Sequence, residues 1–136
     1  VAMSKSPITC HVLDSSLGKP AAGVKIQLQE YHSPSFEGGA VVWEPLAAGE
    51  TNADGRCMDL LPPQNSVEAG ENHTQLKPGG LYKIVFKTKA YFEHSQRQSF
   101  YPWVEARIPF QVLNPEEHYH IPLLISPYSY TTYRGS

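Results

Sequence analysis

The sequence predicts an all-β fold in which two antiparallel sheets, with about eight strands in total, pack as a sandwich and carry one short helix. Apolar and polar side chains alternate with a period of two residues in several segments, which is typical of half-buried strands. The 12 prolines and 10 glycines interrupt these segments, so no long helical pattern develops. With 40% hydrophobic residues, the 136-residue chain can form one core, and we expect a single domain over residues 1–136.

The first half of the chain contains four segments with a strand pattern. Turn-forming residues at 14–20 end the first of them, because Asp, Ser, Gly and Pro favour turns. Before the fourth, Asp54 and Gly55 predict a tight hairpin turn, since glycine adopts a positive φ without strain. The four strands are expected at residues 8–13, 24–29, 40–44 and 56–60.

The second half is expected to supply a surface loop, the helix and four further strands. Residues 64–78 are polar and unpatterned, which predicts a surface loop. Good helix formers replace the strand pattern at residues 89–98, where we expect the short helix. The remaining strands are predicted at residues 81–88, 104–112, 118–125 and 128–133, with a break at Ser126 and Pro127.

The composition argues against several classes of protein. A formal charge of −2 with scattered Lys and Arg provides no basic surface, so nucleic acid is not an expected partner. No apolar run is long enough to span a membrane and no leader pattern is present, so we expect a soluble protein of the cytoplasm or the peroxisome. Without an export signal, Cys10 and Cys57 are expected to stay reduced and to pack in the core.

The carboxyl-terminal strands and three earlier segments together resemble a known family. Residues 119–131, Tyr-His-Ile-Pro-Leu-Leu-Ile-Ser-Pro-Tyr-Ser-Tyr-Thr, resemble the carboxyl-terminal signature of the transthyretin-like family. Residues 8–14, 18–21 and 51–56 are similar to the first strand of that family, to the turn after it and to an Asp-Gly-Arg turn. The terminal Tyr-Arg-Gly-Ser at 133–136 resembles the enzymatic branch of the family, the 5-hydroxyisourate hydrolases.

This resemblance implies a reaction, a site and an assembly. The reaction is the hydrolysis of 5-hydroxyisourate, the product of urate oxidation, at a cyclic amide to give 2-oxo-4-hydroxy-4-carboxy-5-ureidoimidazoline, and it implies no cofactor. If the first strand joins the sheet of the terminal hairpin, as the family implies, then His11, His120 and Tyr133 share one polar face. The family also implies a homotetramer whose sites lie in a channel at the dimer–dimer interface.

The residues that the resemblance selects suit the steps of a hydrolysis. His11 and His120 are expected to orient water and remove its proton, because the pKa of imidazole is about 6.5. Arg56 is expected to bind the oxygen-rich substrate and to stabilise charge on the carbonyl oxygen. The residues expected to bind substrate are two of these together with the end of the chain. They are His11, Arg56, Tyr133, Arg134, Gly135 and Ser136.

Two other interpretations stay open. One is a carrier of the transthyretin type, which binds an apolar ligand in the same channel without catalysis, although the polar His11, Arg56 and His120 suit a small polar ligand better. The other is a metal site, because His118 and His120 point to one side of a strand. No third ligand with a supporting motif accompanies them, so we expect no metal in catalysis and, at most, adventitious zinc.

Overall fold

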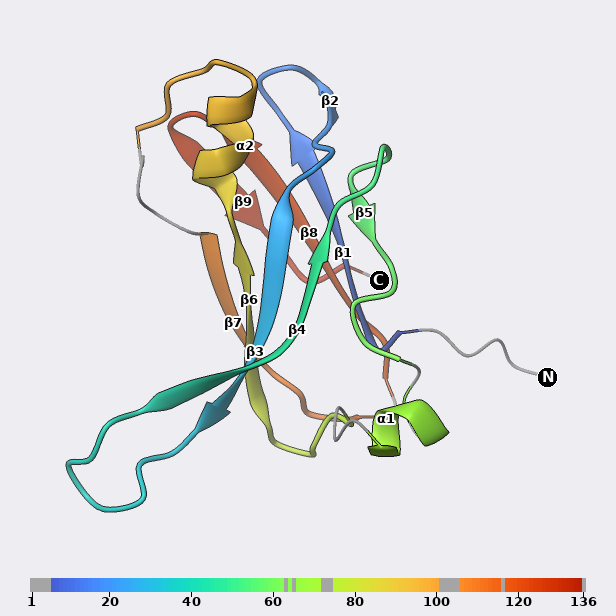
Figure 1. Cartoon of the computed structure of the whole chain (residues 1–136), viewed down its shortest axis with the longest axis vertical. Helices are drawn as coiled ribbons and strands as arrows, with labels where there is room; N and C mark the ends of the chain where they lie inside the picture. The colour runs from blue at the N-terminus through green and yellow to red at the C-terminus, as the bar shows by residue number, and fades with distance from the viewer. Residues whose placement is uncertain are drawn as a thin grey trace.

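The structure is a computed structural model that describes residues 6–62, 64, 66–71, 75–100, 106–115 and 117–135. Two sheets form a sandwich, and two short helices lie at opposite ends of it (Figure 1). The helices are α1 (Val67–Glu71) and α2 (Thr88–His94). The strands are β1 (Ile8–Asp14), β2 (Lys19–Pro20), β3 (Lys25–His32), β4 (Val42–Glu50), β5 (Arg56–Cys57), β6 (Leu81–Phe86), β7 (Ala106–Gln111), β8 (Tyr119–Ser126) and β9 (Ser129–Thr132). The predicted all-β sandwich is confirmed, with nine strands among the described residues.

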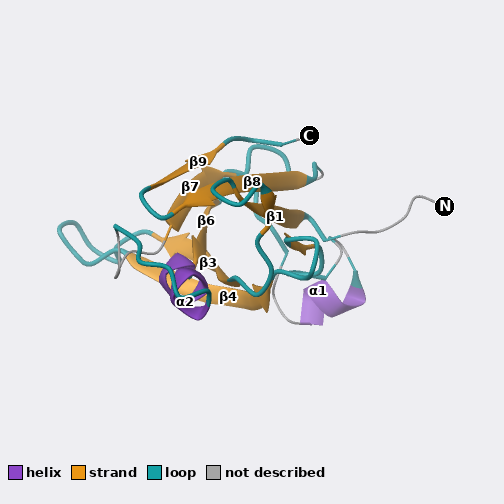
Figure 2. Ribbon diagram, turned by 90° about the horizontal axis from the view of Figure 1, so that it is seen from above, coloured by secondary structure: helices purple, strands orange, loops and turns teal. Residues whose placement is uncertain are grey.

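The first and last strands of the chain belong to the same sheet. One sheet has the order β2-β1-β8-β9, with β5 also paired to β1, and the other has the order β4-β3-β6-β7. Figure 2 shows β1 and β8 in one layer and β3 and β4 in the other. β1 and β8 run parallel, whereas the other described pairs are antiparallel. The first strand therefore joins the sheet of the terminal hairpin, as the family resemblance implied.

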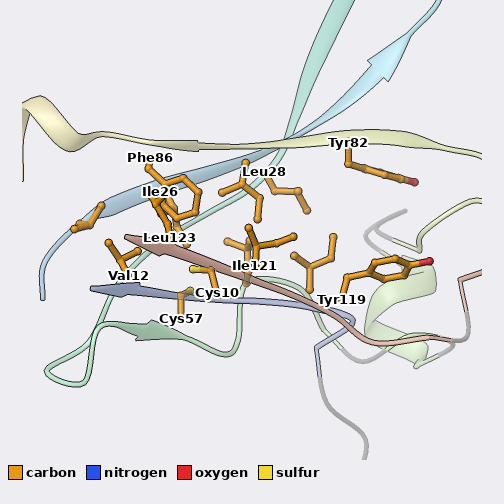
Figure 3. Close-up of a cluster of buried hydrophobic side chains, with 14 of the residues drawn as sticks. Cys10, Val12, Ile26, Leu28, Cys57, Tyr82, Phe86, Tyr119, Ile121 and Leu123 are labelled. Carbon is orange, nitrogen blue, oxygen red and sulfur yellow. The ribbon is translucent and has the colours of Figure 1, made fainter. Parts of the chain in front are cut away.

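Alternation along the strands determines which side chains enter the core. Ile8, Cys10 and Val12 of β1 are 0%, 1% and 0% exposed and belong to the hydrophobic core. Figure 3 shows Cys10 and Val12 on the side of β1 that faces Ile26 and Phe86 of the opposite sheet. Cys57 is the cross-strand partner of Cys10 and is also buried, and both are free thiols as predicted. The hydrogen bond with Cys57, and then burial, raise the pKa of the Cys10 thiol above its ordinary value.

Three predictions about the first half of the chain are wrong, and one of them is the fourth strand, which ends at Cys57 and not at residue 60. The turn at residues 52–55 is not a hairpin turn between paired strands, because β4 and β5 lie in different sheets. The third strand is longer and later than predicted, since β4 continues to Glu50. A bulge explains the error: Gln29 pairs with Pro45 and Leu28 with Ala47, so Leu46 is an extra residue that breaks the two-residue period.

The helices also differ from the prediction. α1 lies inside the expected loop at 64–78, and Ser66 caps it by accepting the N–H of Ala69 at 3.0 Å. Five residues are too few to show a helical period, which is why the sequence did not reveal it. α2 ends earlier than predicted, at His94. Residues 104–105 of the predicted seventh strand lie outside the described residues, and neither described helix has the length and apolar character needed to cross a bilayer.

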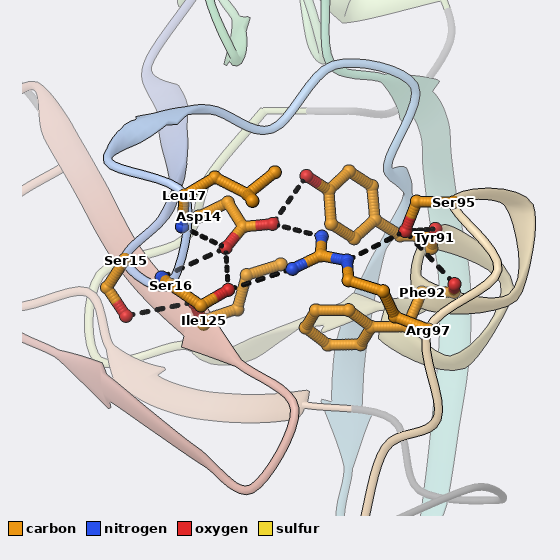
Figure 4. Close-up of polar contacts among 9 residues, drawn as sticks. All are labelled: Asp14, Ser15, Ser16, Leu17, Tyr91, Phe92, Ser95, Arg97 and Ile125. Atoms are coloured by element: carbon orange, nitrogen blue, oxygen red, sulfur yellow. Dashed lines mark hydrogen bonds and ion pairs between the residues drawn. The ribbon is translucent and has the colours of Figure 1, made fainter.

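The end of β1 is joined to α2 by a buried polar cluster. Asp14, predicted to lie in a turn, is the last residue of β1 and is fully buried. Its carboxylate accepts hydrogen bonds from Ser16 and Tyr91 at 2.5 and 2.8 Å and forms an ion pair with Arg97 (Figure 4). Burial opposes ionisation of Asp14, but these partners outweigh it and hold its pKa at about 2.

Candidate active site

The outward-facing side chains of β1, β5 and β8 meet on one face of the first sheet. His11 lies opposite Arg56 on the antiparallel neighbour and opposite Pro122 on the parallel one. Residues that face each other across paired strands point to the same side of a sheet. His11 is half-buried and Arg56 is exposed, so the structure brings these two predicted residues together at the surface.

The turn before β5 positions both residues. Gly55 has a φ of +76°, and a Cβ there would lie 2.3 Å from the carbonyl oxygen of Val12, so only glycine allows this close approach. The side chain of Asn52 accepts the N–H groups of Asp54 and Arg56 at 2.9 and 3.0 Å. The N–H of Val12 donates to the carbonyl oxygen of Gly55 at 2.7 Å, so the turn is also bound to β1.

The same turn determines which nitrogen of His11 carries a proton. His11 Nε2 lies 3.0 Å from the carbonyl oxygen of Asp54. Because a carbonyl oxygen only accepts hydrogen bonds, Nε2 must donate. In the neutral ring the lone pair is therefore on Nδ1.

His120 is held by a chain of hydrogen bonds that begins at Ser6. His118 Nδ1 lies 3.0 Å from the carbonyl oxygen of Ser6, and His118 Nε2 lies 3.0 Å from Thr9 Oγ1. Thr9 Oγ1 in turn lies 2.7 Å from His120 Nδ1. Thr9 is only 1% exposed, and the two imidazole rings stack with centroids 6.4 Å apart.

The donors and acceptors in this chain can be assigned when both imidazoles are neutral. The Ser6 oxygen only accepts, so His118 carries its proton on Nδ1 and accepts the Thr9 hydroxyl proton at Nε2. Thr9 Oγ1 then accepts a hydrogen bond from His120 Nδ1. The lone pair of His120 is consequently on Nε2, the nitrogen suited to remove a proton from water.

The end of the chain lies beside His120. Gly135 forms an isolated bridge with His120 and donates its N–H to the carbonyl oxygen of His120 at 2.9 Å. A Cβ on Gly135 would lie 2.8 Å from Cδ2 of the His120 ring and 3.1 Å from Pro122. Glycine therefore allows the terminal segment to pass directly over the imidazole, while Ser136 lies outside the described residues.

Arg134 is not brought to the histidine face. Its guanidinium pairs with Glu117 at 2.7 Å and lies 4.7 Å above the ring of Tyr119, a core residue. Tyr133 is 60% exposed at the same edge of the sheet. Both residues line a cavity of about 380 Å³, and Phe110 and Leu113 also line it. The structure thus places Tyr133 and Arg134 at the open edge between the two sheets.

Thr9 is a site residue that the sequence analysis missed, and His118 was considered only as a metal ligand. The signal for Thr9 was its place two residues before His11, on the same side of β1. That spacing alone could not reveal its contact with two histidines, because the parallel pairing of β1 and β8 is not evident from the sequence.

Comparison with known proteins connects this arrangement to one family. Residues 8–135 match the model of the HIUase/Transthyretin family. The chain is 40% identical over 136 residues to 5-hydroxyisourate hydrolase of Mus musculus, and the match covers 100% of both chains. The structure of Klebsiella pneumoniae 5-hydroxyisourate hydrolase is similar at a TM-score of 0.67 and 34% identity, covering 98% of this chain and 100% of that one. The structure of sea bream transthyretin in complex with thyroxine is similar at a TM-score of 0.72 and 30% identity, and the match covers 96% of this chain and 95% of that one.

Proposed function

Since the chain belongs to the HIUase/Transthyretin family, we propose that it is a hydrolase of urate catabolism whose substrate is 5-hydroxyisourate. The observation that carries this proposal is full-length similarity to hydrolases of that name in a chain whose His11, Arg56 and His120 lie on one sheet face. The product is 2-oxo-4-hydroxy-4-carboxy-5-ureidoimidazoline.

His120 is the general base in this proposal. Its Nε2 removes a proton from water while the water oxygen bonds to the carbonyl carbon of the cyclic amide. The C–N bond then breaks, the imidazolium returns its proton to the leaving nitrogen, and a carboxylate remains. Thr9 and His118 support this role because they hold His120 in the tautomer that has its lone pair on Nε2.

Arg56 and His11 act on the substrate side of the reaction. The carbonyl oxygen gains negative charge as water attacks, and the exposed guanidinium of Arg56 stabilises that charge. His11, which faces Arg56 across the strands, binds the substrate or the water through Nδ1. Both are positioned by the turn that ends at Gly55.

The carboxyl terminus completes the site. Gly135 lies against His120, and in this proposal Ser136 binds substrate or water next to it, Tyr133 closes the site from the edge of the sheet, and Arg134 fixes the segment through Glu117. A homotetramer with its sites at the dimer–dimer interface, and a location in the cytoplasm or the peroxisome, belong to the same proposal. Sedimentation of the purified chain tests the tetramer.

Identification of the product tests the proposed reaction. 5-Hydroxyisourate is generated from urate by urate oxidase in ¹⁸O-labelled water, and the product is followed by NMR and mass spectrometry. We expect the protein to accelerate formation of the ring-opened carboxylate, which acquires one ¹⁸O atom from solvent in this step. A different product formed at an enzyme-dependent rate would contradict the proposal.

A carrier function is the second candidate. It is favoured by the similarity to sea bream transthyretin and by the apolar Leu13, Pro122 and Leu124, which share the histidine face. Calorimetry with thyroxine and with urate separates the candidates. Tight thyroxine binding without any hydrolysis would favour the carrier.

A further inference from the structure

A separate cluster of titratable side chains lies on the second sheet, away from the histidine face. Glu30 and His32 belong to β3 and Glu44 to β4, where the β3–β4 ribbon extends beyond the sandwich (Figure 1). Glu44 is the cross-strand partner of Glu30, and His32 is two residues further along the same side of β3. One potential ligand atom from each residue lies within 4.8 Å of the others. We propose that Glu30, His32 and Glu44 form a binding site for a divalent transition-metal ion.

The distances within this cluster suit an ion better than a hydrogen bond. His32 Nε2 is 3.5 Å from Glu30 Oε1 and 3.5 Å from Glu44 Oε1. The Nε2 atom is buried and makes no hydrogen bond in the part of the chain that the structure describes. Nitrogen and oxygen ligands about 2.1 Å from a tetrahedral zinc ion are separated from one another by about 3.4 Å. The ring nitrogen is therefore spaced from both carboxylates as ligands of one ion are.

Glu30 is held in place for such a role. Its side chain is only 10% exposed. Its Oε2 atom accepts a hydrogen bond from the Tyr82 hydroxyl at 3.3 Å and pairs with Lys77 Nζ at 3.3 Å. These contacts leave Oε1 directed toward His32. Carboxylates that bind metals are typically fixed by such additional partners, which reduce the cost of ordering the site.

The charges of the cluster also favour a cation. Like charges directly opposite on paired strands repel, and Glu30 and Glu44 are such a pair. Lys77 offsets only part of this negative charge. One imidazole nitrogen and two carboxylate oxygens are donors that suit zinc, cobalt and manganese, with positions left for water.

Zinc titration of the full chain tests this site. The protein is treated with a chelator, dialysed, and titrated with zinc chloride in a calorimeter. We expect one zinc ion per chain at this site and at least about tenfold weaker binding in His32→Ala and in Glu44→Gln. Cobalt in place of zinc should give the visible absorption of a tetrahedral site, which the same variants lose. The matched control is His120→Asn on the other sheet, which should retain this binding.

Three results would overturn the proposal. They are no zinc binding by the wild-type protein, unchanged affinity in both His32→Ala and Glu44→Gln, or loss of binding in His120→Asn alone. Glu44 has a side chain that is 58% exposed, so Glu44→Gln keeps the test decisive even if His32→Ala folds poorly. Circular dichroism of each variant confirms that the fold is intact.

Discussion

Thr9 Oγ1 lies 2.7 Å from His120 Nδ1, although 111 residues separate them in the sequence. The contact exists because β1 and β8 pair in parallel with Thr9 opposite His120. Through Thr9, His120 is coupled to His118 and to the backbone at Ser6. The orientation of the proposed base thus depends on a hydroxyl group that is itself buried.

Replacing Thr9 with Val tests this coupling. The substitution keeps the branched shape but removes the hydroxyl that fixes the His120 tautomer. We expect kcat to fall about 10- to 100-fold with KM little changed, because general-base catalysis contributes effects of this size or larger. Steady-state kinetics over a range of pH should also show a displaced profile, which a purely structural defect would not produce.

The control for this variant is Thr132→Val on β9. The Thr132 hydroxyl donates to the carbonyl oxygen of Pro122 at 2.7 Å and not to an imidazole. The Thr132→Val variant should retain most of the wild-type activity. A folded Thr9→Val protein with wild-type kcat and pH profile would remove Thr9 from the mechanism.

Arg56→Ala should reduce kcat/KM about 10²- to 10³-fold, since it removes a donor to the developing oxyanion. Arg56 is exposed, so the free energy of unfolding should change by no more than about 0.5 kcal/mol. Arg56→Lys keeps the charge but not the planar donors, and intermediate activity is expected. Kinetics and urea unfolding are compared with Lys19→Ala, another exposed cation. Near-normal turnover by Arg56→Ala would contradict its assigned role.

Gly135→Ala should displace the terminal segment from His120. The added Cβ would lie 2.8 Å from Cδ2 of the His120 ring, too close for both to stay in place. We expect activity to fall by up to about 100-fold, because small misplacements of catalytic groups have effects of that order. Gly70→Ala in α1 is the matched control, since a Cβ there would lie no closer than 4.0 Å to any neighbouring atom outside its own helix. Full activity of Gly135→Ala would show that the close contact is not needed.

The buried Asp14 predicts how stability depends on pH. Its pKa falls from an ordinary 3.8 to about 2 in the folded state, because hydrogen bonds and the charge of Arg97 outweigh burial. A depressed pKa stabilises the fold above the unfolded-state value, and this contribution is lost as the pH falls through about 2. Asp14 thus contributes about 2 kcal/mol to the free energy of unfolding at neutral pH, and this contribution disappears at low pH.

Urea unfolding of wild-type and Asp14→Asn proteins from pH 6 to pH 2 measures this contribution. Titration of the other carboxylates is common to both proteins and cancels in the difference. We expect Asp14→Asn to have a lower free energy of unfolding than the wild-type protein at pH 6. The difference between the two proteins should narrow by about 2 kcal/mol as the pH falls from 4 to 2. A gap that stays constant with pH would show that Asp14 does not titrate as its environment implies.

Strand alternation accounts for most of what the sequence could predict. Alternation puts Ile8, Cys10 and Val12 on one side of β1 and His11 on the other, and the structure buries the first three in the core. The same rule put His120 on the outer side of β8, and the family resemblance supplied the shared sheet. Local patterns were sufficient here because each depends only on neighbours along one strand.

Features that depend on distant residues were not predictable in this way. The contact of Thr9 with His120 requires the register between strands at the two ends of the chain. The burial of Asp14 requires Arg97, which reaches it from beyond α2. The bulge at Leu46 interrupts the period on which strand prediction relies.

The most direct test of the central claim is the ultraviolet decay of 5-hydroxyisourate, generated in the cuvette from urate by urate oxidase. Decay is compared without protein, with the wild-type chain and with His120→Asn, each in the presence and absence of a chelator. The proposed function predicts rapid decay with the wild-type chain that the chelator does not slow, and a loss of about 10²-fold or more in His120→Asn. Decay at the spontaneous rate in the presence of folded wild-type protein would contradict it.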